Sequence, residues 1–144
     1  MSSQLWLALS AAASDGFEVL EAINVRVAPD RILIPDLAVV RTPGADRTVA
    51  DPAEVALVVE LTSPGNAVVD RAIKPELYAQ AGIPHYLLIE LGAAPPTAVV
   101  FGLRRGRYAP VRRVGPGERL RLDPFTVDVD LAALATATRP PSST

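Results

Sequence analysis

The stretch VALVVELTSPGN, Val55 to Asn66, sets a carboxylate inside an apolar run. Val55 to Leu61 is almost continuously apolar, the pattern of a strand covered on both faces, and a Thr-Ser-Pro-Gly turn follows it. We therefore expect this strand at the centre of a sheet. Glu60 interrupts the run, and a buried carboxylate is costly unless a cation lies beside it. The stretch thus predicts both a central strand and a cation bound to it.

Composition predicts an ordinary globular domain. A chain of 144 residues with 49% hydrophobic and 21% charged residues fits one domain, for which we expect residues 1–138, with a frayed tail over 139–144. The net charge of -2 does not attract a polyanion, so a nucleic-acid contact would need a local basic patch. The absence of cysteine excludes disulfides, thiolate catalysis and Cys-ligated zinc.

The first residues, MSSQLWLALSAAAS, could be read as a secretory signal or as a helix. Because no Lys or Arg precedes the apolar segment, an ordinary first helix is favoured. No run reaches the roughly 18 apolar residues that a membrane helix needs. We expect a cytoplasmic protein with no membrane contact.

Periodicity along the chain alternates between strand and helix patterns. The expected elements are a helix over 5–13, strands over 17–27 and 32–40, the central strand, a helix from Pro75 to Gly82, a strand over 86–91, strands over 97–103 and 108–114, a last strand over 125–129 and a short helix over 130–136. The strand, helix, strand succession around Pro75 predicts a parallel crossover. The turns at 28–31 and 104–107 predict hairpins.

Asp36 is a second carboxylate within an apolar strand. It follows Pro35, which lacks a donor for the sheet and therefore suggests an edge or bulged position. Two carboxylates on adjacent strands repel unless a divalent cation joins them, and oxygen ligands select magnesium or manganese. The alternative is that Asp36 and Glu60 each lie at a strand end, in solvent or paired with an arginine.

Lys74 is the single lysine, beside 13 arginines. A compact and mobile ammonium suits a place beside a metal-bound water, which makes Lys74 a catalytic candidate. Asp70 lies one helical turn before Lys74, so an ordinary ion pair within the helix is the alternative. Tyr78 lies one turn after Lys74 and would share its face of the helix.

Three further residues have weaker support. Glu21 lies on the apolar face of the first strand and could be a third ligand, although a position at the strand end is favoured. Ser63 has no suitable histidine for a catalytic triad. His85 is the single histidine, which excludes a multi-histidine zinc site, and we expect it to pack locally.

Arginines gather at the turn between the strands over 97–103 and 108–114. Arg104, Arg105 and Arg107, with Arg112 and Arg113 nearby, form the one local basic patch and could contact phosphates. A solvated hairpin tip is the competing interpretation.

Taken in order, these motifs resemble the Uma-two family of restriction endonucleases, within the PD-(D/E)XK nuclease-like superfamily. The resemblance covers residues 31–91, and its motifs are Pro35-Asp36, Glu60-Leu61-Thr62-Ser63-Pro64, Asp70, Lys74, Tyr78, Gly82-Ile83-Pro84 and Tyr86. It implies an α/β (α+β) fold, with a mixed β-sheet flanked by helices and a restriction-endonuclease-like core.

The resemblance also implies roles for individual residues. Asp36 and Glu60 would hold Mg2+ or Mn2+. The superfamily usually has a lysine two residues after the glutamate, where this chain has Thr62, so Lys74 would be its stand-in. Asp70, Thr62 and Tyr78 would be accessory residues.

The implied activity is magnesium-dependent hydrolysis of DNA phosphodiester bonds. A water must become nucleophilic and the growing negative charge must be stabilised, work that the metal and Lys74 would share. The arginine turn would hold the backbone, and a homodimer would suit cutting of both strands. The alternatives are an inactive nuclease-fold module that binds nucleic acid or protein, and a different hydrolase or assembly component.

Overall fold

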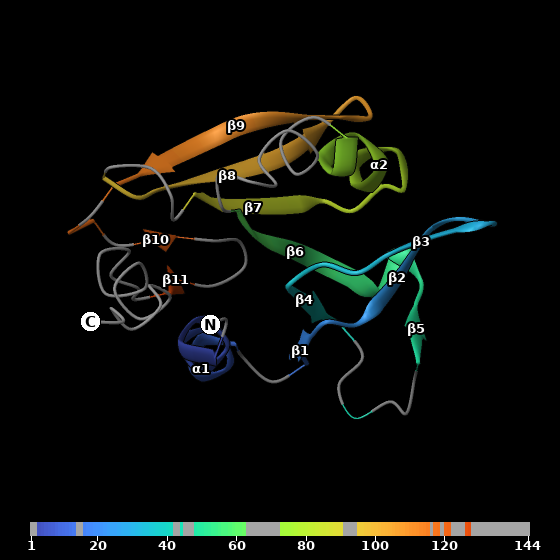
Figure 1. Ribbon diagram of the computed structural model, residues 1–144, viewed down its shortest axis with the longest axis horizontal. Helices are drawn as coiled ribbons and strands as arrows, with labels where there is room; N and C mark the ends of the chain where they lie inside the picture. The colour runs from blue at the N-terminus through green and yellow to red at the C-terminus, as the bar shows by residue number, and fades with distance from the viewer. Residues whose placement is uncertain are drawn as a thin grey trace, which may run out of the picture.

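A six-stranded mixed sheet forms the centre of the computed structural model, which describes residues 3–13, 16–41, 44, 48–62, 73–90, 95–115, 117–118, 120–121 and 126–127. Its strands, in spatial order, are β1 (Glu18–Glu21), β4 (Leu37–Val40), β6 (Val55–Thr62), β7 (His85–Glu90), β8 (Thr97–Arg104) and β9 (Arg107–Val114) (Figure 1). β6 and β7 are parallel and the other neighbours are antiparallel. The predicted mixed sheet is confirmed.

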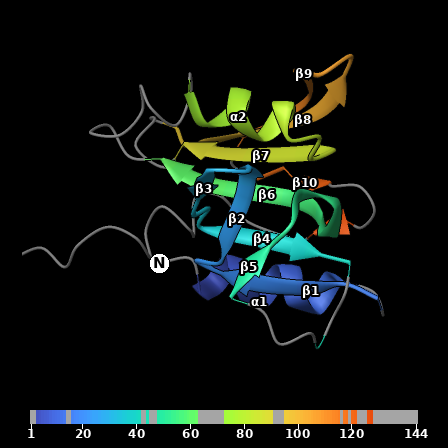
Figure 2. The same ribbon diagram turned by 90° about the vertical axis from the view of Figure 1, so that its right-hand side faces the viewer.

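Smaller elements cover the two faces of this sheet. They are the helices α1 (Ser3–Ala12) and α2 (Lys74–Gln80), the 3-10 helix η1 (Pro52–Glu54), the strands β2 (Asn24–Ala28), β3 (Arg31–Leu33) and β5 (Val49–Ala50) of a second sheet, and the pair β10 (Leu120–Arg121) and β11 (Thr126–Val127). α1 lies on one side of the central sheet, and α2 and the second sheet lie on the other (Figures 1 and 2).

Each face of the sheet has its own apolar core. The face toward α1 buries Leu5, Leu9, Val19, Leu37, Val39, Leu57, Val59, Leu87, Ile89, Ala98, Val100, Val114 and Leu120. The face toward α2 buries Val25, Ala38, Val40, Ala50, Val55, Val58, Tyr78, Ile83, Tyr86 and Leu88. Because side chains alternate along a strand, β6 contributes to both cores, which explains its continuous apolar run. The prediction of β6 as a central strand is confirmed.

The predicted strands over 17–27 and 32–40 each divide into two. β1 and β4 pair in the central sheet, whereas β2 and β3 pair in the second sheet. Ala22 stands at the first break with a positive φ of 51°, and its N–H donates to the Asp36 carbonyl oxygen over 3.2 Å. Pro35 stands near the second break, where it cannot donate to a sheet. The two breaks therefore lie beside each other, where the chain passes from one sheet to the other. The prediction of unbroken strands over 17–27 and 32–40 is wrong.

The crossover and the second hairpin agree with the predictions. α2 has Pro75 in its first turn, and Gly82 follows it with a φ of 87°. Arg105 and Gly106 both have positive φ, which suits the two-residue turn that joins β8 to β9. The predicted helix over 130–136 and the tail over 139–144 lie outside the described residues. Within the described ranges, no helix has the length and apolar character to cross a membrane.

Candidate active site

Asp36 and Glu60 lie on the same face of the central sheet. The antiparallel register pairs Leu37 with Val59, so Asp36 comes opposite Glu60, and opposite residues of a strand pair point to the same side. Ala38 and Val58, two residues along, belong to the core beneath α2. Both carboxylates therefore occupy the α2 face, at the point where β4 begins.

A backbone contact fixes Asp36. Its Oδ2 accepts a hydrogen bond from the Leu61 N–H over 2.7 Å, a short bond of the charge-assisted kind. This bond attaches the start of one strand to the peptide that follows Glu60. No feature of the sequence could reveal it, because its donor is a main-chain group.

Glu60 is buried, with 2% of its surface exposed, and α2 supplies partners for both of its oxygens. The Tyr78 hydroxyl donates to Oε1 over 2.9 Å. The Lys74 ammonium lies 3.6 Å from Oε2. Here the cation beside the buried carboxylate is thus an ammonium.

Helical spacing explains why these two partners meet one carboxylate. Lys74 and Tyr78 are four residues apart, so they share a face of α2. Tyr78 is fully buried, whereas the Lys74 side chain is 25% exposed. Burial, and after it the negative charge of Glu60, raises the pKa of Tyr78 well above its ordinary value of 10. The hydroxyl therefore keeps its proton at neutral pH and remains a donor.

An aromatic cluster holds α2 against the sheet. The rings of Tyr78 and Tyr86 lie 5.8 Å apart, and those of Tyr86 and Tyr108 stack at 5.4 Å. The Tyr108 hydroxyl donates to the Ile83 carbonyl oxygen over 2.8 Å, and burial raises the pKa of Tyr108. Sequence reasoning missed Tyr108, since its position among strand residues gave only its aromatic character as a signal.

The other accessory candidates lie in different places. Thr62 is buried two residues beyond Glu60, on the same face. Glu21 is exposed at the end of β1 opposite Leu37, which puts it on the α1 face, so the structure does not bring it to the two carboxylates. His85 pairs with Leu57, also on the α1 face. Asp70 and Ser63 lie outside the described residues.

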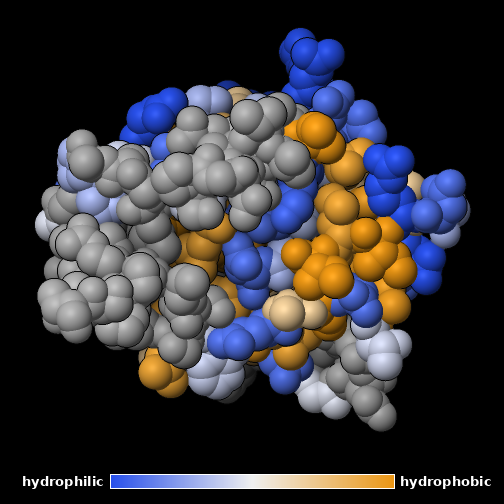
Figure 3. Space-filling view, in the orientation of Figure 1, coloured by the Kyte–Doolittle hydropathy of each residue, from blue (hydrophilic) through white to orange (hydrophobic). Residues whose placement is uncertain are grey.

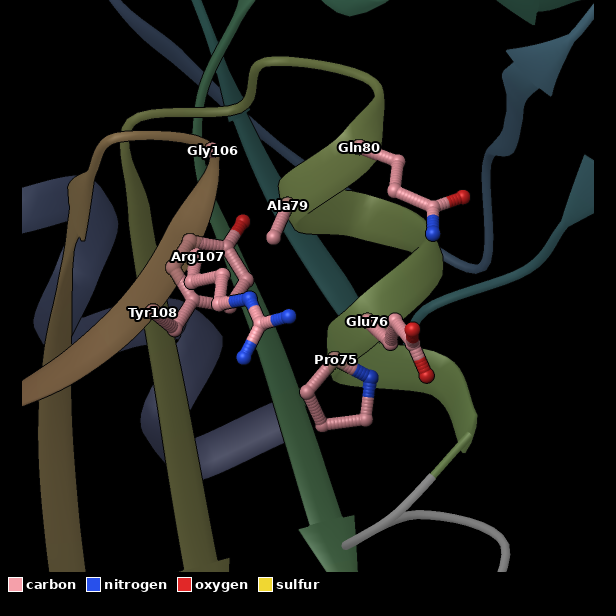
Figure 4. A pocket seen from close by; sticks show the side chains of 7 residues that line it. All are labelled: Pro75, Glu76, Ala79, Gln80, Gly106, Arg107 and Tyr108. Carbon is pink, nitrogen blue, oxygen red and sulfur yellow. The ribbon is translucent and has the colours of Figure 1, made fainter.

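A groove of about 400 Å³ runs between α2 and the turn that joins β8 to β9. It is lined by Pro75, Glu76, Ala79, Gln80, Gly106, Arg107 and Tyr108. The Arg107 guanidinium extends from the hairpin toward Pro75 at the start of α2 (Figure 4). Arg104, Arg105 and Arg107 are all exposed at this turn. The groove adjoins Lys74 through Pro75, and sequence reasoning did not foresee it.

The residues present can accommodate a divalent cation. No group of three or more His, Cys, Asp or Glu suited to a metal occurs among the residues that the structure describes. Magnesium, however, is commonly held by one or two carboxylates, with waters completing its shell. Asp36 and Glu60 supply two carboxylates on one face, so the donor set fits Mg2+ or Mn2+ chemically.

Comparisons with known proteins identify the family and the fold of the chain. Residues 1–135 match the model of the Uma2 family, described as "Putative restriction endonuclease". A crystal structure described as "a putative nuclease belonging to DUF820", from Anabaena variabilis ATCC 29413, has the same fold, with a TM-score of 0.65. It is 12% identical, and the match covers 94% of this chain and 78% of that chain. No curated protein matches.

Proposed function

Because the chain belongs to the Uma2 family, we propose that it is a cytoplasmic, metal-dependent endonuclease that hydrolyses DNA phosphodiester bonds. One observation carries the proposal: Asp36 and Glu60 come opposite each other on one face of the sheet, with the Lys74 ammonium 3.6 Å from Glu60. Restriction endonucleases are a class of enzyme that generally uses a divalent metal. Two carboxylates suffice to hold such a metal, and a lysine beside them can stabilise negative charge on the phosphate.

Asp36 and Glu60 would hold the metal ion. A bound Mg2+ or Mn2+ would make water more acidic and stabilise negative charge on the phosphate. The Leu61 N–H, bonded to Oδ2, orients the Asp36 carboxylate, and the Tyr78 hydroxyl, bonded to Oε1, orients the Glu60 carboxylate and leaves Oε2 to the metal. Rigid ligands of this kind reduce the reorganisation that the reaction needs.

Lys74 would act on the attacking water and on the phosphate. Its ammonium has the capacity to donate hydrogen bonds and carries a positive charge at the edge of the buried site, where that charge is poorly screened. As an ammonium it would orient the water and offset negative charge that develops on the phosphate oxygens. As a neutral amine it would accept a proton from the water. Tyr78 is a positioning residue, because it contacts Glu60 and acts through it.

The arginine turn would hold the nucleic-acid backbone. Arg104, Arg105 and Arg107 are exposed, and the groove beside Arg107 leads to Pro75, the neighbour of Lys74. A nucleic-acid strand in this groove would have its phosphates near Arg107, and Pro75 at the other side of the groove adjoins Lys74 in sequence. Replacing Arg105 and Arg107 by Ala should weaken DNA binding and lower its salt dependence, as measured by fluorescence anisotropy.

The proposed nuclease would act as a homodimer. Ile32, in the outer strand β3 of the second sheet, and Ile34, just after this strand, are 43% and 54% exposed. Apolar surface gathers over β2 and β3 in Figure 3. An apolar strand edge of this kind favours pairing with a second copy. Light scattering of the protein and of an Ile34→Asp variant tests it: a monomeric native protein contradicts the dimer.

A non-catalytic nuclease-fold module is the second candidate function, because one observation favours it. Tyr78 and Lys74 already contact both oxygens of Glu60, and the Leu61 N–H contacts Asp36. Carboxylates that already have partners within the protein can stabilise the fold without binding a metal ion. Such a module would bind nucleic acid or protein with no requirement for metal.

Cleavage of supercoiled plasmid, with and without Mg2+ or Mn2+, separates the two candidates. The native protein should nick the plasmid only with metal. Asp36→Asn, Glu60→Gln and Lys74→Ala should each lose at least about a hundredfold in rate, as expected when a group that stabilises the transition state is removed. Asp30→Asn, an exposed carboxylate in the turn between β2 and β3, is the matched control and should keep full activity. No nicking by folded native protein with either ion would favour the binding module.

A further inference from the structure

We infer that Lys74 and a divalent cation compete for the same oxygen of Glu60, so that the lysine sets the metal affinity of the site. In this inference the ammonium serves as the counter-ion of Oε2 until a metal ion takes its place. The inference rests on the proposed function, because it takes Glu60 to be a metal ligand.

The two oxygens of Glu60 are held in different ways. Oε1 accepts a hydrogen bond of 2.9 Å from a hydroxyl that is fully buried. Oε2 lies 3.6 Å from the Lys74 ammonium, beyond the 2.7–3.2 Å range typical of a hydrogen bond, so this contact is mainly coulombic. A coulombic contact without a directed bond is the easier one for another cation to replace. Of these two contacts, the one between Lys74 and Oε2 is therefore the one expected to exchange.

The two partners also differ in their freedom to move. Tyr78 has no exposed surface and packs against Tyr86, with ring centroids 5.8 Å apart. Lys74 begins α2, its side chain is 25% exposed, and its four-carbon stem has several rotatable bonds. A stem of this length allows the ammonium to change position while the helix stays in place. A stem of this length still keeps it close enough for the catalytic role proposed above.

Charge makes the exchange competitive. An ammonium and a divalent cation on one carboxylate oxygen repel each other strongly, because the buried site screens them less than water would. Removing the ammonium should therefore tighten metal binding, even though it removes a proposed catalytic group. A lysine with a purely catalytic or structural role would leave metal affinity unchanged or weaken it.

Calorimetric titration with Mg2+ and Mn2+ tests this directly. Lys74→Met keeps the length of the side chain without its charge, and should bind either ion roughly tenfold or more tightly than the native protein. Lys74→Arg keeps the charge and should show no such gain. Glu60→Gln should bind either ion much more weakly than the native protein.

A second measurement needs no variant that could fail to fold. Lys74 is the only lysine, so [13C]lysine labelling gives a single side-chain ε-methylene signal in the native protein. Titration with diamagnetic Mg2+ should shift this signal over the same concentration range as the calorimetric binding. The signal should stay in place in Glu60→Gln, where there is no carboxylate charge to exchange.

The outcomes separate this inference from the proposed function. Native protein that binds metal and nicks plasmid, combined with a Lys74→Met variant of equal or weaker metal affinity, overturns the inference alone. A lysine signal that does not shift at saturating Mg2+ does the same. Tighter metal binding by Lys74→Met, with no nicking by the native protein, supports the inference and contradicts the nuclease. Absence of metal binding in both proteins overturns both.

Discussion

The two faces of the central sheet have similar strands but opposite chemistry. The buried side chains of the α1 face are all aliphatic, such as Leu57 and Val59, and Trp6 packs at their border. The α2 face holds both buried polar residues of the described part of the chain, Glu60 and Thr62. The three tyrosines of the sequence also belong to it. One face thus supplies apolar burial, and the other can hold charge because α2 brings partners to it.

The largest expected effect on the free energy of unfolding comes from placing a carboxylate at position 59, on the α1 face, in place of position 60, on the α2 face. Val59→Glu would put a carboxylate into the α1 core, where the described neighbours are apolar, and should cost more than about 4 kcal/mol. Glu60→Val should cost less, about 1–3 kcal/mol, because it puts an apolar side chain on the α2 face but leaves the buried Tyr78 hydroxyl without its acceptor. Urea denaturation of both variants measures this difference. If Val59→Glu unfolds at the native urea midpoint, the α1 core accommodates a carboxylate, and the contrast between the two faces is wrong.

Removal of the Tyr78 hydroxyl should have the next largest effect. Tyr78→Phe leaves a buried carboxylate without its donor at Oε1, which should cost about 1.5–3 kcal/mol in urea denaturation. Because the carboxylate is then less well oriented, metal affinity and the rate of plasmid nicking should both fall. Tyr108→Phe is the matched control. It removes a hydroxyl bonded to a neutral carbonyl, which should cost about 1 kcal/mol and leave metal affinity unchanged. Equal loss of metal binding in both variants would contradict a positioning role for Tyr78.

The sequence allowed most of the sheet to be predicted, because burial leaves a periodic signal. The continuous run of β6, the proline and glycine that bound α2, and the Arg-Gly turn of the β8–β9 hairpin each depend on local properties of a few residues. These elements were predicted close to their observed bounds.

Where prediction failed, the missing information was not local. The period-two pattern continues through both β1 and β2, so it could not reveal that Ala22 turns the chain from one sheet into the other. The face of Glu21 depends on its pairing with Leu37, which the pattern of β1 alone does not fix. The contact between Lys74 and Glu60 follows from how α2 packs on the sheet, so the sequence suggested the residues without their geometry.

Alkaline pH should weaken the α2 face selectively. The pKa values of Tyr78 and Tyr108 are raised above 10, whereas tyrosines in the unfolded chain ionise near 10. Their contribution to stability is therefore complete below pH 10. It is lost as the pH rises above 10, by about 1.4 kcal/mol for each tyrosine at pH 11. Urea midpoints measured at pH 8, 10 and 11 should fall above pH 10, and the fall should be shallower in Tyr78→Phe. An identical fall in that variant would contradict the role of Tyr78 in this loss.

The smallest expected effect lies on the opposite face. Trp6, the only tryptophan, is partly exposed at the edge of the α1 core, and its Nε1–H donates to the Val19 carbonyl oxygen over 2.9 Å. Trp6→Phe keeps an aromatic ring and removes this one neutral bond, so it should cost about 1 kcal/mol in urea denaturation. Metal affinity and nicking should stay at native values, because the carboxylates and α2 lie across the sheet. A folded variant that lost metal binding would show that the two faces are coupled. It would contradict the conclusion that the α1 face contributes only apolar burial and the α2 face alone carries the metal site.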